Sequence, residues 1–407
     1  MTSGAATGAI VFCNRFYAPD HSATSQLLQD LARQLAARGR RVTVIASRMR
    51  YDDPQARLPA RERLEGVTVL RVATTRFGRA HLPGRALDYL SFYLTAGWAL
   101  LRTLRRGDIA VSLTDPPLLS LVCGLCARLR GARWVNWLHD LYPEIAAELG
   151  VRLARGGSGA LLRALRDRNL RAAALNVVLG ERMAERLRGA GVPPARLAVI
   201  ENWADAGIHP VAAADNPLRR DWQLADRFVV GYSGNLGRAH EFRTLLDAAQ
   251  HLRGERDVVF AVIGGGHGRA DLAHAVARHG FAQFRFFGYQ PRQRLAESLS
   301  VADLHLVSLR PALEGLIVPS KLYGAAAAGR PMIFIGDADG ESARWLRRHS
   351  AGETVAPGDG AALAAAIRRR RDDVALRARE GAAARAAVEL ARTRALDDWE
   401  ERLAALG

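Results

Sequence analysis

The stretch Leu304-His-Leu-Val-Ser-Leu-Arg-Pro-Ala-Leu-Glu-Gly-Leu-Ile-Val-Pro-Ser-Lys-Leu-Tyr-Gly324 decides the fold class of this chain. An apolar strand is predicted over residues 304–307, a loop follows, and a helix is predicted over residues 322–328. Strands that alternate with helices in this way indicate parallel sheets with right-handed crossovers. Ligands bind beyond the carboxyl ends of the strands in such sheets, so we expect this loop to face a ligand.

Lys321 in this loop is the only lysine among the 58 Lys and Arg residues of the 407-residue sequence. A compact ammonium on a flexible stem suits a point contact with a phosphate better than a planar guanidinium does. Ser320 and Lys321 also lie at the predicted helix start, where free amides and the helix dipole favour an anion. Glu314 could accept hydrogen bonds from sugar hydroxyls. The alternative is a lysine that survived by chance on a surface.

The alternation of strands and helices runs along the whole chain and breaks once, around residues 201–210. Two such series imply two doubly wound, Rossmann-like α/β domains that face each other across a cleft. We place an N-terminal domain at 1–204, a C-terminal domain at 205–385, and a C-terminal helix at 386–407 that packs back on the N-terminal domain. The predicted strands are 9–13, 42–46, 68–71, 109–113, 134–137, 176–179 and 199–200 in the first series, then 228–232, 258–263, 284–287, 304–307, 332–335 and 354–355.

The net charge of +17 suggests an anionic partner, either nucleic acid or anionic lipid. The arginines are spread along the chain without interleaved aromatic residues, which argues against a nucleic-acid stacking surface. The segment 86–106 is apolar, rich in aromatic residues and closed by Arg102, Arg105 and Arg106. It falls short of the roughly 20 clean apolar residues of a membrane span. An interfacial helix and a buried core helix are both compatible with it.

The N-terminal residues argue against a secreted protein, and the cysteines argue against a redox or zinc site. Met-Thr-Ser-Gly-Ala-Ala-Thr-Gly lacks the basic region and apolar run of a signal peptide, so we expect a cytoplasmic protein. Cys123 and Cys126 form a C-x-x-C inside an apolar predicted helix, whereas a redox or zinc site would need a turn and further ligands. We therefore expect these thiols to be buried.

Three loops in the first half follow predicted strands. One contains Asp20, His21 and Ser22 and leads into a helix whose N-terminus could receive an anion, although Ser22 is also an ordinary N-cap. A second contains Asp115, followed by two prolines that fix a turn. The third contains His139 and Asp140, and a His-Asp pair at a strand end commonly places a polar group with a set tautomer. We expect His139 to be a catalytic or sugar-contacting group, and a capping role is the alternative.

Further candidate loops follow strands of the second half. Gly234, Asn235, Arg238 and His240 lie after the strand 228–232, where glycine lets the backbone approach a ligand and Arg238 and His240 could meet phosphate. The glycine-rich run 264–268, which includes Gly265, is a weak dinucleotide signal because it follows the second strand of its series and no acid follows the next strand.

Two last features of the second half involve acidic residues. Asp337 and Asp339 form an Asp-x-Asp sequence, which we interpret as a turn and cap instead of a metal–diphosphate site. Glu341, two residues further on, is the better candidate for a ligand contact.

These motifs together resemble glycosyltransferase family four, which has the two-domain GT-B fold. More narrowly, the chain is similar to bacterial enzymes that build colanic acid and O-antigen by adding sugars such as fucose or N-acetylfucosamine. The resemblance implies a nucleoside-diphosphate-sugar donor such as a UDP-sugar in the C-terminal domain, an acceptor in the N-terminal domain, no metal, no other cofactor, and retention at the anomeric carbon. It is carried by Trp137-Leu-His-Asp-Leu-Tyr-Pro-Glu144, Glu201-Asn-Trp-Ala-Asp205, Tyr232-Ser-Gly-Asn-Leu-Gly-Arg238 and Pro319-Ser-Lys-Leu-Tyr-Gly-Ala-Ala-Ala-Ala-Gly-Arg-Pro331.

The chain departs from the family pattern at three positions. Where the family usually has a glutamate that binds ribose, this chain has Gly324, and where it often has Arg and Lys for the diphosphate, this chain has Asn235 and His240. We expect Arg238, Lys321 and Glu341 to take over these contacts.

The sequence therefore predicts a retaining glycosyltransferase that works at the inner face of the plasma membrane on a lipid-linked glycan, with an anionic membrane surface and no nucleic acid as partner. The alternatives are a nucleotide-sugar epimerase of the same fold and a basic, non-catalytic lipid- or nucleic-acid-binding protein. The predicted catalytic residues are His139, Asp140, Glu314 and Lys321. The predicted donor contacts are Gly234, Asn235, Arg238, His240, Gly265, Tyr289, Pro319, Ser320, Lys321 and Glu341, and the predicted acceptor contacts are Asp20, His21, Ser22 and Asp115.

Overall fold

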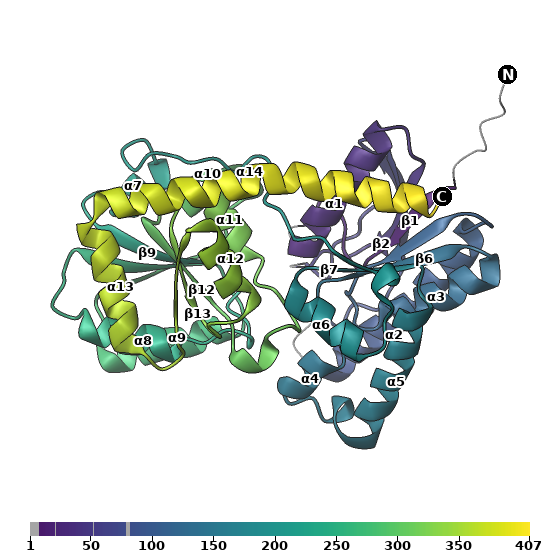
Figure 1. Ribbon diagram of the computed structural model, residues 1–407, viewed down its shortest axis with the longest axis horizontal. Coiled ribbons are helices and arrows are strands. Elements are labelled where there is room, and N and C mark those ends of the chain that lie inside the picture. Colours follow the sequence, from purple (N-terminus) through teal and green to yellow (C-terminus); the bar gives the residue numbers. More distant parts are fainter. Residues whose placement is uncertain (1–7, 21, 52, 79–81) are drawn as a thin grey trace. The chain divides into compact units, whose positions relative to one another are not determined.

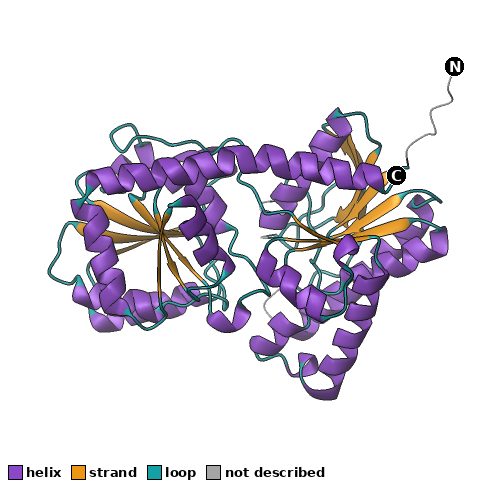
Figure 2. Ribbon diagram, viewed as in Figure 1, coloured by secondary structure: helices purple, strands orange, loops and turns teal. Residues whose placement is uncertain are grey.

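The structure, a computed structural model, describes residues 8–20, 22–51, 53–78 and 82–407. The chain divides into two compact units, each a sheet between layers of helices (Figures 1 and 2). Unit 1 comprises Met1–Glu201 with Arg394–Gly407, and unit 2 comprises Asn202–Thr393. From the sequence we placed the domain boundaries after residues 204 and 385. In the structure they fall after residues 201 and 393, so a longer part of the last helix belongs to unit 2 than expected.

Unit 1 is built on an eight-stranded sheet with the order β3-β4-β2-β1-β5-β6-β7-β8. Strands β1, β5 and β7 are buried along their whole length, as expected for parallel strands covered on both faces. The strands are β1 (Ile10–Cys13), β2 (Val42–Ser47), β3 (Arg61–Leu64), β4 (Val67–Val72), β5 (Ile109–Ser112), β6 (Arg133–Leu138), β7 (Leu175–Val178) and β8 (Leu197–Val199).

The edge strand β3 corrects the expectation of purely parallel sheets, because it pairs antiparallel with β4. The strand β3 was not predicted, because its residues are mostly polar and give no apolar strand pattern. The two strands are joined by Glu65 and Gly66, whose φ angles are 46° and 86°. Positive φ at both central residues is the geometry of a two-residue hairpin turn, and Glu-Gly is a weaker sequence signal for it than Asn-Gly or Asp-Gly.

The helices of unit 1 bury their apolar faces on this sheet. Phe92, Ala96 and Leu100 of α2 pack with Val11 and Cys13 of β1. Cys13, Cys123 and Cys126 are free and buried in the same cluster, as the sequence predicted for the C-x-x-C pair. The helices are α1 (Ala23–Ala37), α2 (Leu82–Thr103), α3 (Leu119–Arg130), α4 (Glu144–Glu148), α5 (Gly156–Ala172) and α6 (Glu181–Gly189), with short 3₁₀ turns at Arg152–Ala154 and Pro194–Arg196.

Unit 2 is built on a six-stranded parallel sheet with the order β11-β10-β9-β12-β13-β14. Its strands are β9 (Phe228–Ser233), β10 (Val258–Ile263), β11 (Phe284–Phe287), β12 (Leu304–Ser308), β13 (Met332–Ile335) and β14 (Gly352–Val355). Its helices are α7 (Pro217–Asp221), α8 (Arg243–His251), α9 (Gly268–His279), α10 (Leu295–Ser300), α11 (Lys321–Ala327), α12 (Glu341–His349) and α13 (Gly360–Asp372), with 3₁₀ turns at Arg292–Arg294 and Pro311–Leu313.

The strand order fixes where ligands are expected in each unit. In unit 1 the chain order reverses between the neighbours β1 and β5, and in unit 2 it reverses between β9 and β12. The loops that leave such a pair of strands run in opposite directions, which opens a crevice at the carboxyl edge of the sheet. The functional side chains should therefore follow β1 and β5 in unit 1, and β9 and β12 in unit 2.

The last helix, α14 (Val374–Ala405), begins in unit 2 and ends in unit 1. Trp399 is fully buried, and its ring lies 4.7 Å from that of Trp137 on β6. Asp397 and Glu400 form ion pairs with Arg38, and Arg133 donates to the Leu406 carbonyl. The helix end is thus anchored on the strand that precedes His139.

We expect Trp399→Ala to lower the free energy of unfolding of unit 1 by about 3 to 5 kcal/mol, because it leaves a large cavity beside Trp137. Chemical denaturation followed by circular dichroism measures this change. Leu390→Ala is the matched control, since Leu390 lies on the same helix and is 60% exposed. Equal stability of the two variants would show that the Trp399 contact does not hold unit 1 together.

Candidate functional site

Lys321 lies at the centre of a cluster of polar groups at the topological switch of unit 2. Its ammonium is 4.0 Å from the centre of the Tyr232 ring and donates to the Tyr232 hydroxyl. It also donates to the Asn235 carbonyl at 3.3 Å and to Nε2 of His240 at 3.3 Å. Tyr232 is the second-last residue of β9, Asn235 and His240 follow this strand, and Lys321 begins α11. The structure therefore brings together three of the predicted donor contacts, Lys321, Asn235 and His240.

His240 is held in one tautomer by this cluster. Its Nδ1 lies 2.7 Å from the Ser308 carbonyl at the end of β12. A carbonyl can only accept, so Nδ1 carries the proton and Nε2 is free to accept from Lys321. Burial, and then the neighbouring Lys321, lower the pKa of His240 to about 3. The imidazole is therefore neutral at physiological pH and leaves Lys321 as the group of the cluster that can carry a positive charge.

The Lys321 ammonium is an incompletely neutralised cation. Burial lowers its pKa to about 7, because its nearest partners are neutral and do not replace the water that it has lost. An anion at this point would favour the charged form and raise the pKa again. The cluster is therefore suited to a phosphate, whose oxygen could take the place of the Asn235 carbonyl.

The glycines in the loop after β9 and in the loop after β10 allow these two loops to pack closely against each other. A Cβ on Gly264 would lie 2.2 Å from the Gly234 carbonyl oxygen, and one on Gly266 would lie 2.2 Å from Oδ1 of Asn235. Gly234 donates its N–H to the Ile263 carbonyl at 2.8 Å. Close backbone contact explains the run 264–268 and also fixes the position of Asn235.

Five other predicted donor contacts lie in the loops around this cluster. A Cβ on Gly265 would come within 2.9 Å of the Tyr289 ring, which is 62% exposed. Arg238 is exposed, and its guanidinium lies 3.2 Å from Nε2 of His267. Pro319 and Ser320 precede α11, and the Ser320 side chain forms no cap hydrogen bond.

Glu314 and Glu341 lie together at the start of α12. The Glu314 carboxylate accepts the Glu341 N–H at 2.8 Å. Burial raises the pKa of Glu314, and this hydrogen bond opposes the rise. Both residues are nearly buried, with exposures of 8% and 9%. Glu314 thus satisfies the helix N-terminus through one oxygen, so a sugar hydroxyl would have to share that carboxylate.

The Asp-x-Asp sequence forms the predicted turn but not the predicted cap, because the N-cap residue of α12 is Gly340. Oδ1 of Asp337 accepts the Asp339 N–H at 2.9 Å, and Asp339 forms an ion pair with Arg344 at 3.1 Å. In the residues that the structure describes, no group of three or more His, Cys, Asp or Glu side chains is arranged to hold a metal ion. These carboxylates have local partners that explain their presence.

Gly324 lies against the neighbouring helix α10. A Cβ there would be 3.3 Å from the Leu299 side chain. A side chain at this position would make a tight contact that Leu299 could relieve only by shifting. Packing between the two helices is thus a physical reason for glycine at this position.

His139 follows β6 in unit 1 and is only 6% exposed. Its ring lies 4.9 Å from that of Trp137, which in turn packs on Trp399. Burial lowers the pKa of His139 to about 3, so the imidazole is neutral. Its Nε2 has no hydrogen-bond partner. The ring is positioned by aromatic packing and keeps one nitrogen for a ligand.

The predicted His139–Asp140 pairing is wrong. The Asp140 carboxylate instead accepts from the Thr114 hydroxyl at 3.4 Å. Burial, and then the charge of Asp115, raise the pKa of Asp140 to about 6. Consecutive residues of an extended segment point to opposite sides, so Asp140 faces the β5 loop and His139 faces the Trp137 ring. The structure therefore groups Asp140 with Asp115 but not with His139.

The loop that carries these residues is fixed by Glu144 and Arg166. The guanidinium forms two hydrogen bonds with the carboxylate, at 2.6 and 2.9 Å, and a third with the Tyr142 carbonyl at 2.8 Å. A bidentate pair of this kind is strong and directional. Glu144, which belongs to the motif behind the family resemblance, thus positions the loop.

The remaining predicted acceptor contacts lie in the loop after β1. Asp20 uses both carboxylate oxygens to hold this loop, accepting from the backbone N–H of Ser22 at 2.8 Å and of Tyr51 at 2.5 Å. Ser22 occupies the N-cap position of α1 without a side-chain cap bond, and its buried hydroxyl has no partner. His21 lies outside the described residues. Asp20 is therefore a structural residue, whereas the Ser22 hydroxyl keeps its hydrogen-bonding capacity.

Sequence reasoning missed Arg15, which follows β1. Its side chain is 2% exposed, lies 3.5 Å from Asp88, and leaves Nε and Nη1 without partners. Its backbone N–H donates to the Asp115 carbonyl at 2.7 Å, which joins the β1 and β5 loops at the switch point. Arginine is so common in this chain that nothing in the sequence distinguished this one.

Sequence reasoning also missed Asn136, which is fully buried between β5 and β7. Its amide accepts from Ser112 at 3.1 Å and donates to Asn176 at 2.8 Å. These bonds align the strand ends next to His139. A polar residue inside an apolar strand was the available signal.

The comparisons with known protein families cover most of the chain. Residues 23–203 match the glycosyl transferase 4-like domain, and residues 227–373 match glycosyl transferases group 1. The chain belongs to the group 1 glycosyltransferases. It is 31% identical over 268 residues to the probable glycosyltransferase WbjE of Pseudomonas aeruginosa, a match that spans 65% of this chain and 66% of WbjE. It is 28% identical over 337 residues to the putative colanic acid biosynthesis glycosyl transferase WcaI of Escherichia coli K12, spanning 79% of this chain and 82% of WcaI.

Solved structures confirm the GT-B fold that the sequence predicted. Sucrose-phosphate synthase of Thermosynechococcus elongatus is similar over 98% of this chain and 97% of its own, with a TM-score of 0.74 and 19% identity. Anabaena HepE in complex with UDP is similar over 98% of this chain and all of its own, with a TM-score of 0.70 and 18% identity. The lipopolysaccharide glycosyltransferase WaaG is similar over 95% and 98% of the two chains, with a TM-score of 0.66 and 17% identity.

We expect the enzyme to take up a proton when it binds UDP at about pH 8, because a diphosphate beside Lys321 should raise the pKa of its ammonium from about 7. Affinity should then weaken as the pH rises above 7. Titration calorimetry in buffers of different ionisation enthalpy measures the uptake. Lys321→Arg is the matched control, since arginine is charged throughout. The same proton uptake in both proteins would contradict this assignment.

Proposed function

We propose that this glycosyltransferase moves a sugar, with retention at the anomeric carbon, from a nucleoside-diphosphate-sugar to a lipid-linked glycan during bacterial surface polysaccharide synthesis. Similarity to WbjE, a probable glycosyltransferase, supports the transferase activity, and similarity to WcaI, a putative colanic acid biosynthesis enzyme, supports the pathway. The UDP-bound and UDP-glucose-bound forms of HepE support a nucleotide-sugar donor of the uridine class. No helix among the described residues is long and apolar enough to cross a membrane.

The observation that carries the proposal is the Lys321 cluster at the switch point of unit 2. A diphosphate leaving group gains negative charge as its bond to the sugar breaks, and a fixed cation next to it stabilises that charge. The tyrosine, histidine and carbonyl that hold Lys321 fix its position before the substrate arrives. Lys321, with Arg238 at the rim, supplies the positive charge that a metal ion would otherwise provide, so we propose a metal-independent reaction.

The reaction that fits this site is a front-face substitution. The bond between the anomeric carbon and the diphosphate oxygen breaks, and the acceptor hydroxyl forms its bond on the same face. The hydroxyl proton passes to the departing phosphate oxygen, so no protein nucleophile is needed. The protein contributes charge stabilisation and orientation of the two substrates.

The neutral His139 is suited to the sugar and not to the phosphate. Its pKa of about 3 keeps it uncharged, and its free Nε2 can exchange a hydrogen bond with a sugar hydroxyl. Glu341 remains our candidate for the ribose, in place of the side chain that Gly324 lacks. On the acceptor side, Arg15 offers two unpartnered guanidinium nitrogens to the phosphate of a lipid-linked glycan.

We expect Lys321→Ala to cost at least roughly 2 kcal/mol in transition-state stabilisation, which is a 30-fold loss or more in kcat/KM. A thermal-shift screen of UDP, GDP and their sugars first identifies the donor, since a ligand of the folded state raises its stability. Release of the nucleoside diphosphate in the presence of a membrane extract then reports turnover. Arg243→Ala is the control, because this arginine of unit 2 is 86% exposed.

His139→Ala provides the contrasting variant. It should lower turnover while the thermal shift caused by the nucleotide stays as in the wild type, because His139 belongs to unit 1. Near-normal turnover of Lys321→Ala would overturn the diphosphate assignment. Loss of nucleotide affinity in His139→Ala would indicate a structural role for the histidine.

A further inference from the structure

Helix α2 is apolar on two opposite faces. One face is completely buried on the sheet of unit 1 and includes Phe92, Ala96 and Leu100. The other is exposed to solvent, and the exposed fractions are 49% for Leu87, 53% for Leu90, 67% for Leu94 and 59% for Trp98. The helix is therefore a core helix, which is one of the two interpretations left open by the sequence, and it also has an uncovered apolar side.

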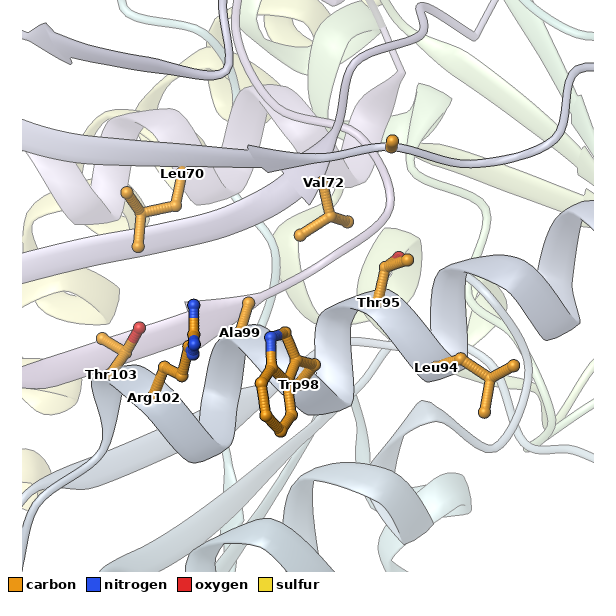
Figure 3. Close-up of a pocket in the computed structure, with 9 residues that line it drawn as sticks. Leu70, Val72, Leu94, Thr95, Trp98, Ala99, Arg102 and Thr103 are labelled. Atoms are coloured by element: carbon orange, nitrogen blue, oxygen red, sulfur yellow. The ribbon is translucent and has the colours of Figure 1, made fainter.

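A groove of about 590 Å³ runs between this helix and β4. Figure 3 shows Leu70 and Val72 extending from the strand towards α2, with Leu94, Trp98 and Ala99 on the helix below. The groove exists because β4 is the second strand from the sheet edge and only the short, polar β3 lies beyond it. Its volume is within the range of roughly 300 to 1,000 Å³ that is usual for small-molecule sites.

The charges around the groove are of one sign. Arg102 lines one end, with its guanidinium 4.7 Å from the centre of the Trp98 ring. Exposed arginines follow at 105 and 106, and at 128 and 130 on the neighbouring helix α3. The only acidic residue of α2, Asp88, is fully buried and accepts from Thr75, Phe77 and Gly78. Helix α3 has no acidic residue, and its Leu125 and Leu129 are exposed.

This combination favours one kind of occupant. Leucine and tryptophan side chains between arginines, without exposed carboxylates, are typical of surfaces that enter the headgroup region of an anionic bilayer. A nucleic acid would use the arginines but leave the leucines in water. An indole with an apolar body and a polar N–H is the side chain most suited to the boundary between chains and headgroups.

We infer that the groove between α2 and β4 binds one hydrocarbon chain of an anionic lipid, with the lipid phosphate at Arg102. Trp98 and Leu94 would lie beside the chain, and Arg105 and Arg106 would lie near neighbouring headgroups. This inference rests on the proposed function in one respect, namely that the acceptor is carried by a lipid. It adds a binding site on unit 1 that is separate from the loops after β1, β5 and β6.

Trp98 is a natural reporter for this site. All seven tryptophans lie in the described residues, and Trp98 is the only one that is exposed. Vesicles of phosphatidylglycerol and phosphatidylcholine should shift its emission to the blue, and bromine on the lipid chains should quench it. Both effects should disappear in Trp98→Phe, which keeps the groove apolar. Inorganic phosphate alone should cause neither, which separates a lipid from a free anion as the ligand.

A matched pair of charge substitutions tests the groove itself. Leu94→Glu places a carboxylate beside the proposed chain, whereas Leu390→Glu makes the same change at a leucine of α14 that is 60% exposed. We expect Leu94→Glu to weaken vesicle binding about tenfold or more, because it buries a charge against apolar groups. Leu390→Glu should bind as the wild type does. The thermal shift with nucleotide should be unchanged in both.

Two results would overturn the inference. One is Trp98 emission that does not change with anionic vesicles at low salt, or that shifts through self-association of the protein without lipid. The other is equal vesicle binding by Leu94→Glu and Leu390→Glu. Because nucleotide binding is measured on the same variants, failure of the lipid site is distinguishable from failure of the proposed transferase reaction.

Discussion

The burial of one ammonium among neutral partners is the constraint on which the site in unit 2 depends. Lys321 is held by Tyr232, by the Asn235 carbonyl and by a histidine whose tautomer is set by the end of β12. Those contacts require the β9 loop, β12 and the start of α11 to meet at one point. The close packing of the glycine loops, and of Gly324 on Leu299, keeps these elements at that spacing. A phosphate bound at this point would offset the cost of burying the cation.

Unit 1 uses aromatic packing and buried amides in place of a buried cation. Trp399 of the last helix packs on Trp137, which packs on His139, so a residue near the C-terminus positions a side chain in the middle of the chain. Asn136 aligns the neighbouring strands, and Glu144 with Arg166 fixes the loop that follows. The result is a neutral imidazole with one free nitrogen, which suits contact with a sugar.

Periodicity predicted the fold, and loop position predicted that Lys321, Asn235 and His240 lie in one region. Buried apolar strands gave clear signals, and β10, β11 and β13 have the predicted bounds. The rarity of lysine pointed to Lys321, and its neighbours Asn235 and His240 were placed by the loop order. The β3 hairpin was missed because its exposed residues are polar. Arg15 was missed because its significance depends on burial beside Asp88, and the His139–Asp140 pairing failed because the geometry of an extended segment separates adjacent side chains.

The central claim is that the Lys321 ammonium receives the donor diphosphate. A crystal structure with UDP bound tests it most directly. We expect a phosphate oxygen within hydrogen-bonding distance of Lys321 Nζ, with His240 still donating to the Ser308 carbonyl. A diphosphate bound elsewhere, with the ammonium still on Tyr232, Asn235 and His240, would contradict the claim.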